Sequence, residues 1–394
     1  MTGARPDYDV LVLGAGPVGL ALATALSRES FSVALVDRAP LPVFDGPASD
    51  EDWDARVYAI SPGSAEFLRA IGAWQRLPGE RLEPIETMDV RGDADGAIEF
   101  SAYELGERAL AWIVEHRELC RALVESARTG GRIETFAPAE PASIAWRADA
   151  GLITLAEGRV LSARLVVGAD GVRSWLRRAA GIEREPRPYR QTAIVANFAT
   201  ERAHRGRAFQ WFLQSRGVLA WLPLPERRIS IVWSAPEALA AELAALDPTS
   251  LAVRVAEAGG KALGALTTIT PSASFPLSFL RLPSVVAHRL AFAGDAAHGV
   301  HPLAGQGVNL GFGDAATLAG VLAAGRATGD FGTPVVLERY ARKRAAPVLA
   351  MQFVTDGLIR LFEPPALRRL RNSGMRAVGA LGPLRRLLAQ PALR

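Results

Sequence analysis

Three glycines near the N-terminus have the spacing of a phosphate-binding turn. Gly14, Gly16 and Gly19 follow the strand-like run 10–13 and open a predicted helix, 17–28. One such glycine allows the tight turn, one lets the backbone approach a pyrophosphate, and one lets the helix pack against the strand. Unpaired N–H groups at the start of the helix attract the phosphates. The turn predicts a dinucleotide cofactor, but alone it does not distinguish a flavin from NAD.

An acidic residue stands where a ribose would be bound. Asp37 follows the second predicted strand, 31–36, and its carboxylate can accept hydrogen bonds from a ribose diol. Arg38 comes next in the chain and is predicted to contribute to the same cofactor site. The order strand, helix, strand around these residues is typical of a nucleotide-binding unit.

A second glycine-rich stretch occurs much later in the chain. Gly294 and Asp295 follow the predicted buried strand 290–293, and the loop 301–307 leads into a predicted helix, 308–324. This stretch resembles the second flavin motif of the class A flavoprotein monooxygenases, the para-hydroxybenzoate hydroxylase-like family. The resemblance implies a flavin held by a discontinuous domain that both ends of the chain build.

A third motif lies between the other two. The Asp-Gly turn 169–174 follows a predicted strand, 164–168, and resembles the third motif of the same family. Asp170 has two interpretations that the sequence leaves open, a contact to the flavin or NAD(P)H and simple support of the turn. The three motifs occur in the family's order, and the resemblance implies non-covalently bound FAD, NADPH or NADH as a transiently bound reductant, and molecular oxygen as co-substrate.

The resemblance also implies roles for single residues. Asp295 would hold a ribityl or ribose hydroxyl, while Gly305 and Gly307 would let backbone N–H groups face the flavin ring and stabilise its negative charge. Pro302 would shape the loop on the ring face where oxygen reacts. The predicted catalytic residues are Pro302, Gly305, Gln306 and Gly307. The predicted cofactor-binding residues are Gly14, Gly16, Pro17, Val18, Gly19, Asp37, Arg38, Arg56, Arg117, Asp170, Gly294, Asp295, Gly305, Gly307, Val308 and Asn309.

Two arginines are predicted to touch the flavin, because a guanidinium offers a fork of donors to phosphate. Arg56 lies in the segment 54–61, where the family places an arginine near the pyrophosphate or the ring. The alternative is an ordinary surface arginine in an acidic loop. Arg117, in the segment 115–119, stands where the family has another flavin contact. Since the chain has five histidines and one cysteine, no metal site is predicted.

The substrate side resembles one branch of the family, the ubiquinone-biosynthesis hydroxylases of the UbiH/UbiF type. The resemblance rests on the segments 55–61, 206–212 and 217–224, and the spacing from 193–197 to 206–209 is most like the UbiH side. Members of this branch hydroxylate the aromatic ring of a polyprenylated phenol, through reduced flavin and a C4a-hydroperoxide. The resemblance implies the same substrate class and chemistry for this chain.

Aromatic residues on the predicted strands of 190–234 could bind such a ring. Phe209, Trp211 and Trp221 are the predicted substrate residues, because large aromatic side chains suit an apolar pocket. The alternative is that they form the core of their own sheet. Trp211 and Trp221 stand where the family would have smaller or different residues, which leaves the hydroxylated ring position open.

The predicted function is therefore NAD(P)H- and FAD-dependent hydroxylation of a lipophilic prenylated phenol in ubiquinone biosynthesis. Two alternatives stay open, a class A flavin monooxygenase acting on a soluble aromatic or polyketide-like substrate and a non-catalytic flavoprotein partner of a quinone-synthesis assembly. We expect a cytoplasmic location. Contact with the inner face of the cytoplasmic membrane or with other quinone-biosynthesis proteins stays open, as does the oligomeric state.

Composition adds limits to these expectations. The chain has 394 residues, a net charge of +4 and a single cysteine, Cys120, which excludes an internal disulfide and fits a reducing compartment. From Arg360 onward, eight arginines and one acidic residue, Glu363, are interleaved with leucines. This segment either lies on a membrane surface or packs as a helix on its own domain. No nucleic-acid recognition motif accompanies the arginines, so no nucleic-acid partner is predicted.

The elements that position these residues predict an α/β fold. We expect a Rossmann-like FAD-binding domain of the para-hydroxybenzoate hydroxylase type, with an inserted antiparallel α+β substrate domain and a C-terminal helical tail. The predicted FAD-binding domain comprises 1–75, 101–180 and 285–360, the substrate domain 76–100 and 181–284, and the basic tail 361–394. Further helices are predicted over 64–71, 117–128, 236–246, 250–258 and 337–361, and a loop over 45–54.

Overall fold

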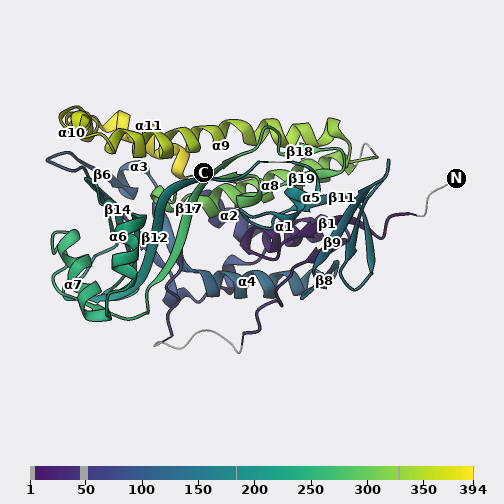
Figure 1. The fold of residues 1–394 in the computed structure, drawn as a ribbon, viewed down its shortest axis with the longest axis horizontal. Coiled ribbons are helices and arrows are strands. Elements are labelled where there is room, and N and C mark those ends of the chain that lie inside the picture. The colour runs from purple at the N-terminus through teal and green to yellow at the C-terminus, as the bar shows by residue number, and fades with distance from the viewer. Residues whose placement is uncertain (1–4, 45–51, 183, 327–328, 394) are drawn as a thin grey trace.

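The computed structural model of the chain describes residues 5–44, 52–182, 184–326 and 329–393 (Figure 1). Most of the predicted loop 45–54 lies outside these residues. Among the described residues, the strands form a largely parallel sheet, a larger antiparallel sheet and a small three-stranded sheet. Figure 1 places the parallel and antiparallel sheets at opposite ends of the molecule, with the long helix α9 (Pro334–Phe362) running along both. The predicted α/β fold is confirmed.

The parallel sheet is built around β1 (Tyr8–Leu13), which is buried on both faces. Val10 and Val12 pack on the side of the helix α1, whereas Leu11 and Leu13 pack on the opposite side. The central strands follow the order β19–β11–β1–β2–β8, and each neighbouring pair is parallel. The other strands of this sheet are β2 (Val33–Val36), β8 (Ile133–Phe136), β9 (Pro141–Trp146), β10 (Gly151–Leu155), β11 (Val160–Gly168), β18 (Val286–Ala287) and β19 (Leu290–Phe292).

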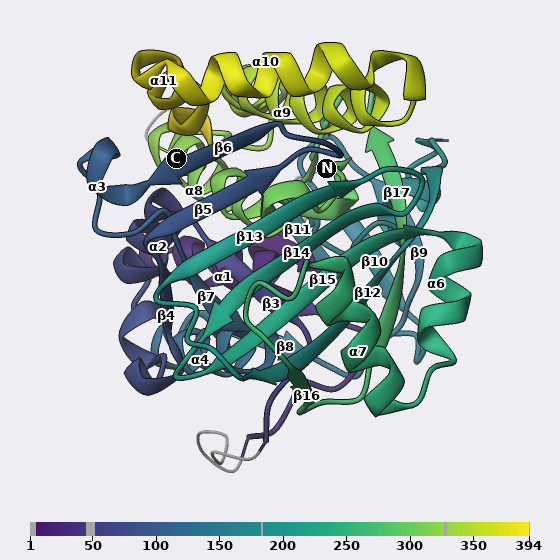
Figure 2. The ribbon, with the colours of Figure 1, turned by 90° about the vertical axis from the view of Figure 1, so that its left-hand side faces the viewer.

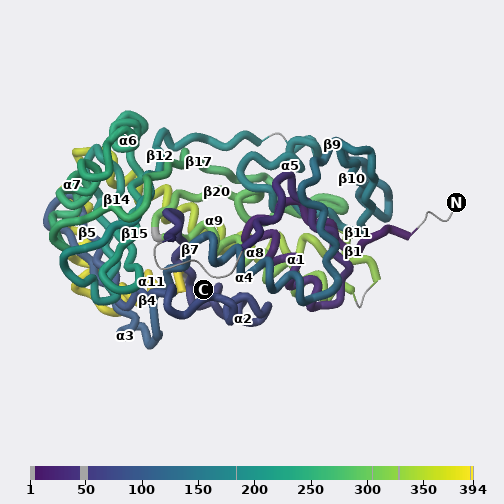
Figure 3. Tube along the Cα trace, turned by 90° about the horizontal axis from the view of Figure 1, so that it is seen from below, coloured from purple at the N-terminus to yellow at the C-terminus, as the bar shows by residue number. Residues whose placement is uncertain are grey.

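Helices cover one face of the parallel sheet, because each buries an apolar stripe against it. The helix α1 contacts both α4 and α8, and Figure 3 shows the three together. The close approach of α8 to α1 needs Gly311, since a Cβ there would lie 2.4 Å from the side chain of Val18. The helices of this half are α1 (Pro17–Arg28), α2 (Pro62–Ala70), α4 (His116–Thr129), α5 (Trp175–Ala179) and α8 (Gly307–Arg326).

The antiparallel sheet follows the order β20–β17–β12–β15–β14–β13–β5–β6. Two helices, α6 (Glu237–Ala244) and α7 (Pro248–Ala258), cover the face that Figure 2 turns toward the viewer. Its strands are β5 (Thr87–Arg91), β6 (Ala97–Ser101), β12 (Arg187–Thr200), β13 (Arg207–Leu213), β14 (Gly217–Leu224), β15 (Arg228–Pro236), β16 (Leu266–Thr268), β17 (Ala273–Arg281) and β20 (His298–Gly299). The several antiparallel strands expected over 190–234 are therefore present.

A small sheet of β3 (Val57–Ile60), β7 (Ala111–Glu115) and β4 (Glu83–Ile85) joins segments that the sequence assigned to different domains. The strand β4 lies in the range 76–100, given to the substrate domain, but it pairs with β7 from the other domain. Likewise, β20 belongs to the antiparallel sheet although it lies in 285–360. The division into domains at these boundaries stays a prediction.

The C-terminal segment forms two helices, α10 (Arg368–Ala380) and α11 (Gly382–Leu393), which lie above β6 in Figure 2, where the short helix α3 (Ala102–Leu105) follows that strand. Asn372 connects α10 to the turn before β6 by hydrogen bonds. Its Oδ1 accepts the N–H groups of Ala94 at 3.2 Å and Gly96 at 3.0 Å. Arg371 is buried and binds Asp93. The segment therefore packs on its own chain, and its outer surface stays exposed.

Two helices, α8 and α9, are long and apolar enough to cross a membrane by length and composition. Both have places in the fold that account for them. The helix α8 packs in the core beside α1, and α9 is joined to the sheet by Gln352, whose Nε2 donates to the carbonyl oxygen of Leu280 at 2.8 Å. Asp356 and Arg360 also interrupt the apolar surface of α9. We therefore describe α9 as a surface helix.

Candidate functional site

The glycine turn after β1 has the geometry of a phosphate site. Gly14 has a φ of +104°, which favours glycine, and a Cβ there would lie 2.3 Å from the carbonyl oxygen of Ala169. A Cβ on Gly19 would lie 1.8 Å from the carbonyl oxygen of Gly14, so α1 packs directly on the turn. Gly16 is the N-cap of α1, and no described atom lies within 4 Å of where its Cβ would be. The α1 N-terminus is thus open to a phosphate.

The first two residues of α1 connect the two glycine motifs. Pro17 occupies the first turn, where its missing N–H group removes no hydrogen bond. Val18 lies against the second motif, because a Cβ on Gly294 would come within 3.2 Å of its side chain. Two motifs that are distant in the sequence therefore meet at Val18.

Asp37 is bound to the glycine turn itself. Its Oδ2 accepts the N–H group of Ala15 at 2.6 Å and its Oδ1 accepts that of Ala39 at 2.8 Å. A carboxylate has further lone pairs, so the same group can still accept a ribose hydroxyl. Arg38 is exposed beside it.

Asp170 supports its turn, and one of its two carboxylate oxygens has no described partner. Its Oδ2 accepts the N–H group of Leu176 at 3.0 Å, at the start of α5, which supports the turn. Its Oδ1 is buried and has no hydrogen-bond partner among the described residues. Its Cα would lie 2.8 Å from a Cβ on Gly14, so it stands beside the phosphate turn. A buried acceptor without a partner is favourable only if a ligand or water donates to it.

Gly294 and Asp295 form a turn directly after β19. Gly294 has a φ of +62°, and its N–H group donates to Asp314 Oδ2 at 2.9 Å. Asp295 is exposed, yet enough protein surrounds it that desolvation raises the pKa of its carboxyl, against the positive charges of His298 and Arg56. An accessible side chain in dense surroundings indicates a concave surface.

A buried ion network, which the sequence analysis missed, lies behind this turn. Asp314 of α8 accepts hydrogen bonds from His298 Nε2 and Arg344 Nε, each at 2.6 Å. Burial alone would raise the pKa of Asp314, but the charges of His298 and Arg344 hold it below its ordinary value. Burial alone would lower the pKa of His298, but Asp314 raises it. The network joins the second turn, α8 and α9 into one rigid unit.

The loop before α8 holds the predicted catalytic residues. It contains the short helix Leu303–Gly305, with Pro302 partly buried at its start and Gln306 buried at its end. Gly305 has a φ of +63°, and a Cβ there would come within 3.1 Å of Ala59. Gly307 begins α8, and Val300, at 3.9 Å, is the one described residue within 4 Å of where a Cβ would be. Small residues thus leave the N-terminus of α8 accessible, and its first N–H groups have no partner within the helix.

Asn309 of α8 fastens this loop to β3. Its Nδ2 donates to the carbonyl oxygen of Ala59 at 2.8 Å, and its Oδ1 accepts the N–H group of Ser61 at 3.0 Å. The amide is therefore a positioning group in this structure. Val308, beside it, packs partly buried against the core.

The two predicted arginines differ in what they contact. Arg56 is exposed, forms no ion pair with a described residue, and lies 5.3 Å from the ring centre of Tyr58. Its charge acts on Asp295, so the structure brings these two predicted residues close together. Arg117 already donates to the carboxylate and to the carbonyl oxygen of Asp52, the latter at 2.7 Å. Arg56 is therefore the more available guanidinium.

The three predicted substrate residues pack in the core of their own sheet, which is the alternative that the sequence left open. Phe209 and Trp211 stack 5.4 Å apart, and Trp221 is fully buried beside them. They pack with α6 and α7, for example against Leu243 and Val255. Side chains alternate between the faces of a strand, so these aromatic residues point away from the parallel-sheet half. The sequence pattern identified the strands but could not tell which face was covered.

The opposite face of the sheet carries neighbours of the loop before α8. Ala208 packs in one cluster with Ala59, and Phe212 packs in another with Leu303. Gln210 lies between them on β13, and its register partner Ala220 remains partly exposed. The face that meets the loop before α8 is therefore formed by the residues that alternate with the predicted aromatic residues.

The residues present fit FAD. The open N-terminus of α1 suits a pyrophosphate, the buried Oδ1 of Asp170 needs a donor, and Arg56 has no described acid as partner. Asp37 and Asp295 offer acceptors for hydroxyl groups, and the α8 N-terminus offers donors for a ring that gains negative charge. When bound, FAD supplies redox and oxygen chemistry that side chains lack.

Comparison with known proteins agrees with this geometry. The family model described as an FAD binding domain matches residues 7–354. The ubiquinone hydroxylase UbiL of Rhodospirillum rubrum is 37% identical, covering 98% of this chain and 89% of that protein. The 3-demethoxyubiquinol 3-hydroxylase of Escherichia coli is 31% identical, covering 98% of each chain. The human ubiquinone biosynthesis monooxygenase COQ6 is 32% identical, covering 98% of this chain and 92% of that protein.

Solved structures agree on the fold. The Pseudomonas aeruginosa protein PqsL in complex with 2-aminobenzoylacetate has a TM-score of 0.78 at 25% identity, covering 94% of this chain and 99% of that chain. A variant of the Klebsiella pneumoniae protein HpxO, complexed with FAD, has a TM-score of 0.75 at 17% identity, covering 98% of each chain. The resemblance predicted from three motifs is thus confirmed, as is FAD as the cofactor. The chain belongs to the FAD-binding-domain family and, within it, to the class A flavoprotein monooxygenases that include the ubiquinone-biosynthesis hydroxylases.

Proposed function

We propose that this protein is an FAD-dependent monooxygenase that hydroxylates the aromatic ring of a polyprenylated phenol in ubiquinone biosynthesis. One oxygen atom of O₂ enters the ring as a hydroxyl group, the other leaves as water, and NAD(P)H supplies two electrons. The observation that carries the proposal is the 31–37% identity, over nearly the whole chain, to proteins named as ubiquinone hydroxylases. The ring position and the UbiH-like assignment stay predictions.

The substrate ring is proposed to lie on the face of the antiparallel sheet that meets the loop before α8. On the helix-covered face, Trp221 and Ile231 are fully buried. On the other face, Ala220, Leu222 and Val232 stay partly exposed within the middle of the sheet. Apolar side chains that remain accessible in such a place suit an aromatic ring with a hydrocarbon tail.

Two polar groups on this face suit the hydroxyl of a phenol. Asn197 and Ser230 are cross-strand partners, and both are fully buried. Asn197 Oδ1 and Ser230 Oγ have no hydrogen-bond partner among the described residues. A hydroxyl group that donates to one and accepts from the other would satisfy them both. We propose that they orient the substrate or an ordered water beside it.

Exposed apolar residues of α9, α10 and α11 are proposed to contact the inner face of the cytoplasmic membrane. Phe353 is 79% exposed on α9, and Leu370 and Leu387 are more than half exposed on α10 and α11. Arg369 and Arg386 directly precede Leu370 and Leu387 in the chain, are exposed and form no ion pair with a described acid, so an anionic lipid surface would complement these helices. A lipophilic substrate would reach the enzyme from that surface. Binding to other quinone-biosynthesis proteins stays open.

Lipid analysis of a strain that lacks the gene tests the reaction. We expect loss of ubiquinone and accumulation of one under-hydroxylated prenylphenol, whose structure names the ring position by mass spectrometry. Complementation with the Ala220→Trp variant should fail although that protein retains FAD, because the larger side chain fills the proposed substrate face. Tyr103→Ser, at an exposed position of α3, is the matched control and should restore ubiquinone.

Other outcomes would point to the alternatives. Normal ubiquinone in a strain without a second hydroxylase would favour a soluble aromatic or polyketide-like substrate. A protein that binds FAD but is not reduced with any substrate would favour a non-catalytic partner. For the membrane face, Phe353→Ser should reduce sedimentation with phosphatidylglycerol vesicles while Tyr103→Ser should not.

A further inference from the structure

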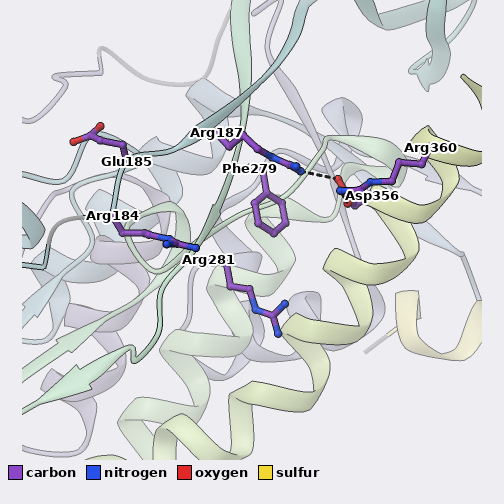
Figure 4. Close-up of a pocket in the computed structure, with 7 residues that line it drawn as sticks. All are labelled: Arg184, Glu185, Arg187, Phe279, Arg281, Asp356 and Arg360. Carbon is purple, nitrogen blue, oxygen red and sulfur yellow. Dashed lines mark hydrogen bonds and ion pairs between the residues drawn. The ribbon is translucent and has the colours of Figure 1, made fainter.

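A charged cavity that the flavin site does not use opens between β12, β17 and α9. Its volume is about 530 Å³, which lies within the range of small-molecule sites. Figure 4 shows four arginines from different elements arranged around the ring of Phe279, and these are Arg184, Arg187, Arg281 and Arg360. The cavity therefore gathers guanidinium groups from distant segments.

The cavity carries an excess of positive charge. Asp356 compensates two of the arginines, since its carboxylate lies 3.2 Å from Arg187 and 2.9 Å from Arg360. Arg184 and Arg281 form no ion pair with a described residue, and Figure 4 shows Glu185 turned away from the group. Two guanidiniums are thus available to an anion, and their planar forks match the oxygens of a phosphate.

An aromatic face adjoins these charges. The guanidinium of Arg187 lies 5.1 Å from the ring centre of Phe279, which is partly exposed. A planar base can stack on such a ring or on a guanidinium, as bases do in nucleotide sites. Arginines beside an aromatic ring therefore fit a nucleotide better than an inorganic anion.

Residues of the cavity contact the segment 298–301, which follows the second flavin motif. Arg281 pairs in register with His298, three residues after Asp295. Tyr189 contacts both sides, with ring centres 6.4 Å from Phe279 and 5.1 Å from His301. His301, which precedes Pro302, donates a hydrogen bond from Nε2 to Gln191 Oε1 at 3.0 Å, and Gln191 lies on the same strand as Arg187. A ligand in the cavity would thus lie one strand from the second flavin motif.

We propose that this cavity binds the phosphate groups of the nicotinamide dinucleotide that reduces the flavin. The proposal rests on the proposed function, which needs this reductant. Arg184 and Arg281 bind the phosphates, Arg187 and Arg360 add positive charge, and Phe279 offers a stacking face. The reductant would dock at the surface without a nucleotide-binding domain of its own.

Binding of non-reducing analogues to the FAD-loaded protein tests the assignment, because the flavin site is then filled. ADP-ribose and 2′-phospho-ADP-ribose carry the phosphates but no nicotinamide. By calorimetry we expect saturable binding that the double variant Arg184→Gln/Arg281→Gln weakens roughly tenfold or more. Arg202→Gln is the matched control, since this exposed arginine lies beyond the opposite end of β12 and has no ion pair with a described acid.

Kinetics give a second readout. The double variant should raise the KM for NAD(P)H about tenfold with little change in kcat, while chemical reduction of the flavin by dithionite and the FAD content stay unchanged. A larger loss for 2′-phospho-ADP-ribose than for ADP-ribose would place the 2′-phosphate in the cavity.

Equal affinity of the double variant and the unchanged protein for both analogues would overturn the proposal. It would also be overturned if the variant lost binding to phosphatidylglycerol vesicles with unchanged analogue binding, because the phosphate recognised would then be a lipid headgroup. Should the protein make no product from prenylphenols, the proposed function fails. Analogue binding that depends on Arg184 and Arg281 would still support the cavity as a nucleotide site.

Discussion

The two sheets of this protein position their functional groups in different ways. In the parallel-sheet half, backbone groups surround the candidate flavin site and single residues are tightly constrained. A Cβ on Gly14 would lie 2.3 Å from the carbonyl oxygen of Ala169, and Asp314 accepts a hydrogen bond from buried His298. In the antiparallel half, side chains that alternate along each strand form the proposed substrate face, so β13 presents Phe209 to one face and Gln210 to the other. Most substitutions in the parallel-sheet half should therefore be harmful. In the antiparallel half, the effect of a substitution should depend on whether its side chain points to the helix-covered face or to the opposite one.

Removing the carboxylate of Asp314 should produce the largest effect on the parallel-sheet half. Asp314→Ala leaves buried His298 and partly buried Arg344 without their carboxylate partner, and losing one member of a buried ion pair costs about 3–5 kcal/mol. We expect protein purified with little FAD and a much lower free energy of unfolding, measured by absorbance and urea denaturation. Arg254→Ala, which breaks an exposed pair with Glu242, should change stability by only about 0–1 kcal/mol. Full FAD content in Asp314→Ala would contradict the network's role.

Neighbouring substitutions on β14 test the two faces of the antiparallel sheet. Trp221→Ala should lower the free energy of unfolding by about 3–5 kcal/mol, because it empties a packed core, with little effect on the substrate KM of the folded protein. Leu222→Ala should cost about 1–2 kcal/mol and raise the KM for a short-chain prenylphenol. Urea denaturation and steady-state kinetics measure both. The reverse pattern would return the substrate to the aromatic face.

Two histidines after the second flavin motif, His298 and His301, should make the free energy of unfolding depend on pH in opposite directions. Burial lowers the pKa of His301 to about 3. The unfolded chain, with a histidine pKa of about 6.5, takes up the proton first, so stability falls by about 1.4 kcal/mol per pH unit as the pH drops below about 6.5 toward 3. The pKa of His298 is raised in the folded protein, so its effect on stability has the opposite sign. The stabilisation that His298 provides is complete below the pKa of the unfolded chain and is lost as the pH rises through the pKa of the folded protein.

Variants separate these two effects. In urea denaturation over a pH series, His301→Gln should remove only the loss of stability at acid pH. His298→Gln should remove only the loss of stability as the pH rises. If the free energy of unfolding of His301→Gln still falls at acid pH, other groups, such as buried carboxylates, control that fall.

The smallest expected effect sharpens the comparison of the two arginines. Arg56→Ala should weaken FAD binding about tenfold, because its guanidinium is available to the cofactor. Arg117→Ala should weaken it by about threefold or less, because that guanidinium is already bound to Asp52. Fluorescence titration of the apoprotein with FAD measures both constants. A larger loss for Arg117→Ala would reverse the assignment.

The sequence predicted those parts of the fold that depend on local chemistry. The helix α1 has the predicted bounds 17–28, because a glycine turn followed by Pro17 marks its start. The flavin motifs were recognisable for the same reason, since a positive φ at Gly14 or Gly294 restricts the residue type.

The rest depends on tertiary contacts that spacing does not reveal. Asp314 and Arg344 are 30 residues apart on different helices, and nothing in either helix indicates that they meet. The sequence identified Trp211 and Trp221 as important apolar residues, but the choice between pocket and core needed the position of α6 and α7. The arginine cavity combines residues from β12, β17, α9 and the segment before β12, so its charge is visible only in the folded chain.

The attachment of α10 to the turn before β6 has a consequence for synthesis on the ribosome. Asn372 binds backbone groups of Ala94 and Gly96, which are translated long before it. The edge strand β6 therefore stays uncovered by α10 until Asn372, 278 residues after Ala94, has been synthesised. The nascent protein passes through a long period in which this edge can pair with another chain, so we expect chaperone binding to the β5–β6 hairpin and aggregation of truncated products that lack the last helices.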